Sequence, residues 1–129
     1  MYEAIENCLL EERYSLGIKK ISEFLIKIGI YPKLKGFTLL LYAVLTVLKN
    51  PESIHSITTT LYPTVAKAFG VSVACVERNM RNAIETAYNS GKLQETANRF
   101  YGGNFKKYEK PTNGEFISYM VSIVKFSTF

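Results

Sequence analysis

The sequence has 129 residues, the length of one domain that can bury an apolar core without disulfide bonds. Its longest apolar run, FTLLLYAVLTVL at 37–48, is shorter than the about 20 residues of a transmembrane helix, and its acidic N-terminus lacks the basic start of a secretory signal. The 16 basic and 11 acidic residues give a net charge of +5. We therefore expect a cytoplasmic protein with no membrane span.

The positive charge is unevenly distributed along the chain. Residues 1–23 hold five glutamates and three bases, whereas the remainder holds 13 bases and six acids. A basic body of this kind attracts a polyanionic partner such as nucleic acid. The two cysteines are far apart and are expected to be reduced thiols, and the single histidine, His55, leaves too few side chains for a zinc site or a catalytic triad. We expect no metal, no cofactor and no enzymatic activity.

Apolar residues recur every three or four positions along most of the chain, which predicts an all-α fold. We expect a compact bundle of about six helices and an additional N-terminal helix. The first helical pattern covers residues 3–29, with a break near residues 15–17, and Tyr31 and Pro32 end it. A second helix is expected over residues 35–49.

Helix-capping signals mark the next three helices. Residues 50–52, Asn-Pro-Glu, resemble an N-cap, a proline at the first helical position and an acid near the positive helix end, so a short third helix should follow. The segment PTVAKAF at 63–69 predicts another helix, which Gly70 closes. Ser72 can cap a longer helix that continues to about Ser90, where a glycine ends it.

The C-terminal part of the chain predicts two more helices and a loop. A short helix is expected over residues 93–101, followed by a loop rich in Gly, Asn and Lys. Thr112 and Glu115 have the spacing of a capping box ahead of the apolar run at 116–124. The last helix should start there.

The helix that follows Ser72 has two distinct faces at about 100° per residue. Its apolar arc, which should face the core, contains Val73, Val76, Met80, Ala83, Ile84 and Ala87. The opposite arc contains Ala74, Glu77, Arg78, Arg81, Asn82 and Glu85, with Cys75 at its margin. The helix therefore displays a polar strip near its N-terminal end.

The helix at 63–69, the turn at Gly70 and the helix after it form a helix-turn-helix pattern. In that motif the second helix enters the DNA major groove and its N-terminal residues reach base edges. Arg78 and Arg81 suit bidentate contacts with guanine, and Glu77 suits acceptance from cytosine N4, each worth about 1 to 3 kcal/mol of discrimination. The alternative is an ordinary solvated face, because an exposed i, i+4 pair such as Glu77 and Arg81 adds only about 0.3 to 0.5 kcal/mol.

Four segments in order carry a family resemblance: IGIYPKLKG at 28–36, SITTTLYPTVAKAFG at 56–70, VERNMRNAIETAYNSG at 76–91 and KPTNGEFI at 110–117. Over residues 21–124 the chain resembles the C-terminal DNA-binding effector domain of the master sporulation response regulator of endospore-forming bacteria. The resemblance implies an all-helical domain whose V-E-R-x-x-R element reads a short operator. Position by position, it assigns base reading to Glu77, Arg78 and Arg81.

The same resemblance implies supporting or phosphate contacts from Ser72, Ala74, Cys75, Asn82, Lys35 and Lys67. Cys75 departs from the family, which commonly has a basic residue there, so one contact to DNA could be missing. Lys33 also lies near the expected DNA side. For the basic loop at 106–110, a phosphate contact and a solvated loop are both open interpretations.

The resemblance implies double-stranded DNA as the main partner, with RNA polymerase and a second copy on tandem sites as further candidates. Members of the family carry a receiver domain that is phosphorylated on aspartate, whereas all 11 acids of this chain are glutamate. We therefore expect a transcription regulator free of receiver control, either a stand-alone protein or an excised domain. Its alternative is a protein-interaction module that modulates a full-length regulator without strong DNA binding. We expect residues 1–20 to form a helical extension, or a frayed leader, before a helix-turn-helix domain at 21–129.

Overall fold

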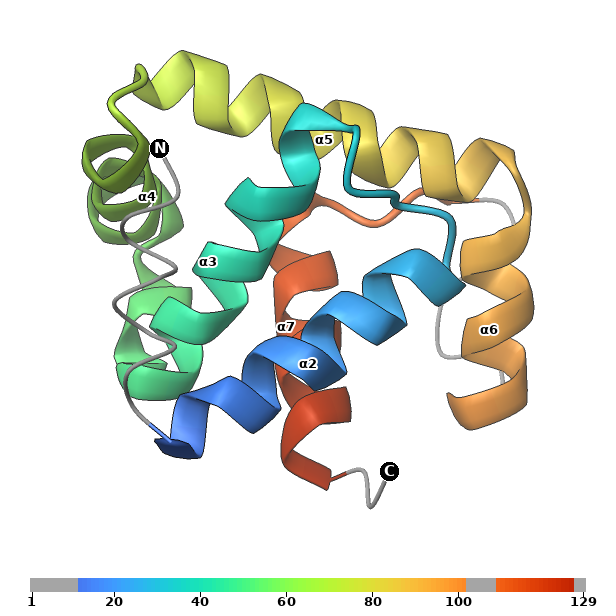
Figure 1. Cartoon of the computed structure of the whole chain (residues 1–129). Helices are drawn as coiled ribbons and strands as arrows, with labels where there is room; N and C mark the ends of the chain where they lie inside the picture. The colour runs from blue at the N-terminus through green and yellow to red at the C-terminus, as the bar shows by residue number, and fades with distance from the viewer. Residues whose placement is uncertain (1–11, 102–108, 127–129) are drawn as a thin grey trace.

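The computed structural model describes residues 12–101 and 109–126, and these ranges form an all-α fold without strands (Figure 1). The α-helices are α2 (Glu12–Lys27), α3 (Lys35–Lys49), α4 (Tyr62–Phe69), α5 (Val73–Asn89), α6 (Lys92–Tyr101) and α7 (Asn113–Phe126). A 3-10 helix, η1 (Pro51–His55), and a π-helical turn, η2 (Ile57–Leu61), connect α3 to α4. The predicted compact helical bundle is confirmed.

Helix α3 lies at the centre of the bundle, in contact with α2, α4, α5 and α7 (Figure 1). Nine of its 15 residues are buried, as expected for a helix that is apolar on nearly all sides. Helix α5 runs along one edge of the molecule, at the top of the view, and α6 packs against its C-terminal half. The aromatic residues predicted for the core are buried or half-buried: Phe24, Phe37, Tyr42, Phe69, Phe116 and Tyr119.

Helix α2 is continuous through residues 15–17, so the predicted break there is wrong. Glycine inside a helix costs about 1 kcal/mol relative to alanine, and the burial of neighbouring apolar side chains offsets that cost. Ile18 packs against the core and Ile21 is fully buried. The helix also crosses the expected domain boundary after residue 20. The division of the chain at that point stays a proposal, and residues 1–11 lie outside the described residues.

The segment between α3 and α4 differs from its prediction in helix type. The short helix begins at Pro51 as expected, but it is a 3-10 helix, and the side chain of Asn50 makes no capping hydrogen bond. Instead, the Ser53 backbone N–H and Oγ both donate to the Asn50 carbonyl, at 3.1 and 2.8 Å. The sequence did not indicate the π-helical turn η2, whose Leu61 is fully buried.

Three predicted helix ends are confirmed. Gly70 ends α4 in the left-handed conformation, with φ 66° and ψ 36°. Ser72 caps α5, because its Oγ accepts the backbone N–H of Cys75 at 3.0 Å. The capping box of α7 is complete: the Thr112 N–H donates to Glu115 Oε1 at 2.9 Å, and the Glu115 N–H donates to Thr112 Oγ1 at 3.1 Å.

The crossing of α3 and α5 depends on a glycine that the sequence did not single out. A Cβ on Gly36 would lie 2.6 Å from the Cβ of Ala83 and closer still to the carbonyl oxygen of Asn79. Side chains cannot approach that closely, so the backbones of the two helices meet here only because Gly36 has no side chain. This contact sets the distance of α5 from the core.

Candidate nucleic-acid interface

Helices α4 and α5 are arranged as a helix-turn-helix. After Gly70, the backbone N–H of Val71 donates back to the Ala66 carbonyl at 3.0 Å, which closes the turn. The inner side of α4 is buried at Val65, Ala66 and Phe69. The Phe69 ring meets the Tyr42 ring of α3 edge to face, with 5.5 Å between centroids. The first helix of the motif is therefore anchored on the central helix of the bundle.

The buried face of α5 agrees with the helical wheel at five of six positions: Val76, Met80, Ala83, Ile84 and Ala87. The prediction is wrong for Val73, which is 38% exposed. Val73 is the first residue of the helix, and the buried face begins one turn later at Val76. The first turn of α5 thus projects beyond the core and is accessible to a partner.

Two of the predicted base-reading residues already contact each other. Arg81 Nη1 donates to Glu77 Oε1 across one helical turn, and both side chains are partly accessible, at 46% and 39%. An exposed i, i+4 ion pair is worth only about 0.3 to 0.5 kcal/mol. The pair can therefore open at little cost when a better partner arrives.

Arg78 is exposed on the same helix and has a different environment. Within the described ranges, Arg78 makes no hydrogen bond and no ion pair. No described neighbour neutralises its positive charge, whereas Glu77 pairs with Arg81. Arg78 is the cation of this strip that is ready to bind an external acceptor.

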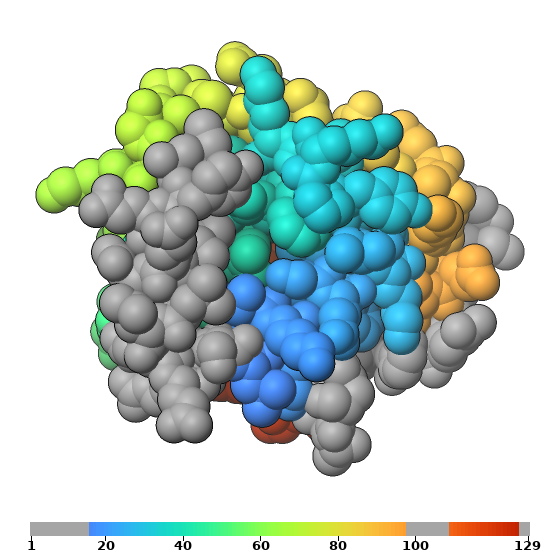
Figure 2. All heavy atoms as spheres, in the orientation of Figure 1, coloured from blue at the N-terminus to red at the C-terminus, as the bar shows by residue number. Residues whose placement is uncertain are grey.

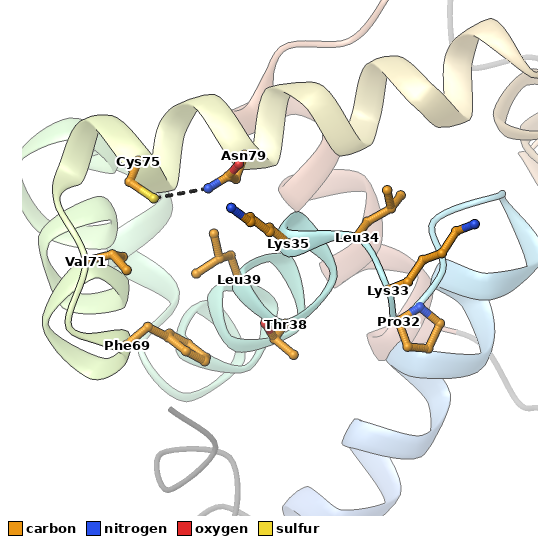
Figure 3. A pocket seen from close by; sticks show the side chains of 10 residues that line it. All are labelled: Pro32, Lys33, Leu34, Lys35, Thr38, Leu39, Phe69, Val71, Cys75 and Asn79. Carbon is orange, nitrogen blue, oxygen red and sulfur yellow. Dashed lines mark hydrogen bonds between the residues drawn. The ribbon is translucent and has the colours of Figure 1, made fainter.

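The six supporting candidates lie in different environments. Ala74 and Asn82 are exposed on α5 near the arginines, whereas the Oγ of Ser72 is occupied as the helix cap. Cys75 is a free, half-buried thiol whose sulfur accepts from the Asn79 side chain at 3.1 Å. It shares a cleft of about 290 Å³ with Lys35 of α3 (Figure 3).

Lys67 is exposed in the last turn of α4 and has no hydrogen bond or ion pair among the described residues. Figure 2 shows that the start of α3, in cyan, and the adjoining part of α5, in yellow, form one continuous surface at the upper edge of the molecule. Lys35 of α3 and Cys75 of α5 line the same cleft, so these two candidates lie on one side of the molecule.

The model of the family described as sporulation initiation factor Spo0A C terminal matches residues 21–124. The chain belongs to this family. The Spo0A C-terminal family consists of DNA-binding effector domains of a sporulation regulator, and these are transcription-factor domains and not enzymes. The family resemblance inferred from the four sequence segments is confirmed. None of the helices in the described part of the chain combines the length and the apolar character needed to cross a bilayer.

A buried polar contact that sequence analysis missed fixes α5 in this Spo0A-type domain. Asn113, at the start of α7, is 8% exposed. Its Nδ2 donates to the Tyr62 hydroxyl of α4 at 3.0 Å and to the Glu77 carbonyl of α5 at 3.1 Å. One side chain therefore ties together both helices of the helix-turn-helix and the last helix. The capping box marked where α7 begins but gave no signal for these long-range partners.

We expect Asn113→Ala to lower the free energy of unfolding by about 1 to 3 kcal/mol, because it leaves the buried Tyr62 hydroxyl without its donor. Urea unfolding of the wild type, Asn113→Ala, Tyr62→Phe and the double variant measures this in a double-mutant cycle. Since Tyr62→Phe removes the orphaned hydroxyl, the second substitution should cost less than it does alone. Strictly additive losses would contradict a direct bond between the two side chains.

Burial raises the pKa of the Tyr62 hydroxyl above its ordinary value near 10, although the hydrogen bond with Asn113 acts in the opposite direction. The folded protein therefore favours the protonated phenol. This contribution to stability is complete below the pKa of the unfolded chain and is lost as the pH rises above about 10. Between pH 9 and 11 the wild type should lose more unfolding free energy than Tyr62→Phe. Equal losses of unfolding free energy with pH in the two proteins would contradict this prediction.

The basic loop before α7 is only partly described. Lys106 and Lys107 lie outside the described residues, whereas Lys110 Nζ donates to Glu85 Oε2 at 2.7 Å. This hydrogen bond and the lysine charge lower the pKa of the Glu85 carboxyl. Lys110 is exposed and engaged with α5 in this structure, and both interpretations of the loop stay open.

Proposed function

We propose that this Spo0A-type domain is a sequence-specific, double-stranded DNA-binding transcription regulator. The observation that carries the proposal is the exposed Arg78, which has no ion-pair partner among the described residues, beside the Glu77–Arg81 pair on the helix that follows the turn. A helix in this position enters the major groove with its N-terminal residues facing the bases. Arginine matches the two acceptors of guanine, and glutamate accepts from cytosine N4.

Binding would proceed in two stages that use different residues. Lys35 and Lys67 attract the phosphate backbone and position the domain, together with contacts from Ser72, Ala74, Cys75 and Asn82. These contacts carry no sequence information. Arg78 then binds a guanine, and the Glu77–Arg81 pair opens only where the bases offer both side chains better partners. On a wrong sequence the pair stays closed, so neither Glu77 nor Arg81 gains a contact with a base.

A selection from a random-sequence duplex pool, followed by fluorescence anisotropy with the selected and a scrambled duplex, tests the proposal. We expect a clear preference for the selected sequence and an affinity that falls steeply with salt concentration. Equal affinities for the two duplexes, or no binding, would contradict sequence-specific recognition. That result would favour the protein-interaction module.

We expect Glu77→Gln to strengthen binding to the scrambled duplex several-fold, because it removes a negative charge near the phosphates and releases Arg81 from its ion pair. The preference for the selected duplex should fall, since the carboxylate no longer penalises wrong bases. Anisotropy at two salt concentrations measures both effects. A variant that keeps the wild-type preference would show that the carboxylate takes no part in reading.

Three further parts of the proposal concern partners and control. The domain would act as a homodimer on tandem sites and contact RNA polymerase. Because the chain contains no aspartate, we propose that its DNA binding does not depend on aspartyl phosphorylation of its own residues.

Residues 1–20 would form a helical extension that packs on the body or pairs two protomers. Unchanged mass in analytical ultracentrifugation and unchanged stability after deletion of residues 1–20 would remove that last idea.

A further inference from the structure

A cleft opens between the start of α3 and the turn that joins α4 to α5 (Figure 3). Its volume is about 290 Å³, close to the lower end of small-molecule sites, which hold about 300 to 1,000 Å³. Leu39, Phe69 and Val71 provide apolar surface, and Cys75 and Asn79 of α5 form part of the wall. A site of this size accommodates a small molecule, and the helix proposed to read DNA forms one of its sides.

Among the described residues that line this cleft, the charged side chains are those of Lys33 and Lys35, and none is a carboxylate. Neither lysine makes an ion pair or a hydrogen bond within the described part of the chain. Figure 3 shows that Lys35 reaches from α3 toward Asn79, whereas Lys33 extends away from the rim. A ligand in the cleft would therefore meet an apolar surface on one side and the ammonium group of Lys35 on the other.

We propose that this cleft binds a small aromatic carboxylate. The ring would lie against Leu39, Phe69 and Val71, and the carboxylate would accept hydrogen bonds from Lys35 Nζ and the Asn79 amide. Apolar lining with a few placed polar groups is the usual composition of a small-molecule site. The ammonium and amide groups favour an anion over a neutral ring of the same size.

Occupancy of the cleft would weaken DNA binding, and this second part rests on the function proposed above. A bound carboxylate neutralises Lys35, which is a candidate phosphate contact. It also lies against the first turns of α5. Since linkage is reciprocal, bound DNA would lower the affinity of the cleft for the carboxylate by the same factor. The cleft would thereby make the regulator responsive to a metabolite of this chemical class.

Titration of the full chain with benzoate, followed by NMR without DNA, tests the site itself, and benzyl alcohol is the neutral control of similar size. We expect saturable shifts confined to residues of the cleft, with benzoate binding more tightly than benzyl alcohol. Absence of saturable shifts, or equal affinity for the two probes, would overturn the proposal.

Two variants and one control locate the ligand. Lys35→Gln should weaken the binding of benzoate about two- to fivefold, the value of one partly exposed charge pair. It should leave the binding of benzyl alcohol unchanged. Val71→Trp should fill the apolar side and abolish binding of both probes, with circular dichroism confirming the fold. Lys125→Gln, on the exposed end of α7, should change neither probe. If Lys35→Gln and Lys125→Gln weakened benzoate binding equally, the effect would come from the net charge of the protein, and the proposed site would be overturned.

The coupling to DNA is measured separately by anisotropy with the selected duplex. Saturating benzoate should weaken DNA binding, whereas the same concentration of benzyl alcohol should not. If the NMR shifts are present but benzoate leaves DNA affinity unchanged, the regulatory part is overturned. If no duplex is preferred in the absence of benzoate, the function proposed above fails, and the NMR titration still decides the ligand site.

Discussion

Gly36→Ala should lower the free energy of unfolding by about 1 to 3 kcal/mol or more, the range for overpacked cores. The added Cβ would lie 2.6 Å from the Cβ of Ala83 and closer still to the Asn79 carbonyl oxygen. Because one obstacle is backbone and not the end of a flexible side chain, relief requires α3 and α5 to move apart. Urea unfolding monitored by circular dichroism measures the loss.

Gly17→Ala is the matched control, because Gly17 also lies inside a helix. Among the described residues, a Cβ at Gly17 would meet only Leu45 Cδ2, at the ordinary contact distance of 3.9 Å. Alanine should therefore raise the unfolding free energy by about 0.5 to 1 kcal/mol, the usual gain for this exchange in a helix interior. Changes of the same sign and size in the two variants would contradict the close approach at Gly36.

Arg78→Ala should reduce the preference for the selected duplex over the scrambled one by about fivefold to 150-fold. That range corresponds to the loss of one bidentate contact with a base, worth about 1 to 3 kcal/mol. The substitution breaks no hydrogen bond or ion pair among the described residues, so the fold should be unaffected. Anisotropy with both duplexes at fixed salt measures the ratio, and thermal unfolding checks the fold.

Lys67→Ala separates attraction to the backbone from base reading. The substitution should weaken the binding of both duplexes to the same extent. It should also reduce the slope of log affinity against log salt concentration by about 1, as expected for one phosphate contact. Like Arg78, Lys67 is exposed and has no partner in the described ranges. If Arg78→Ala weakened both duplexes to the same extent, Arg78 would be a phosphate contact and the reading assignment would be wrong.

Features set by neighbouring residues were predictable from the sequence. A left-handed glycine at Gly70, a serine cap at Ser72 and a reciprocal cap between Thr112 and Glu115 each depend on residues within four positions. Their chemistry is therefore visible in a short window. Helix boundaries, and the polar strip that follows from them, were accordingly close to those observed.

Features set by tertiary contacts were not predictable in this way. The break expected near residues 15–17 reflected the low helix propensity of glycine, which the buried Ile21 and its neighbours outweigh. The role of Gly36 depends on its contact with Asn79 and Ala83 of α5, which lie more than 40 positions away in the sequence. Asn113 lies 51 positions from Tyr62 and 36 from Glu77. The cleft likewise combines α3 with the turn after α4, so no single segment indicated it.

The absence of a side chain at Gly36 has a consequence for how a complex would form. With the backbones this close at Gly36, α5 has little room to tilt against α3 at this crossing. In the complex that we propose, the protein would thus behave as a rigid template, and adjustment of shape would fall to the nucleic acid. Base steps that kink cheaply would then gain affinity even at positions no side chain touches.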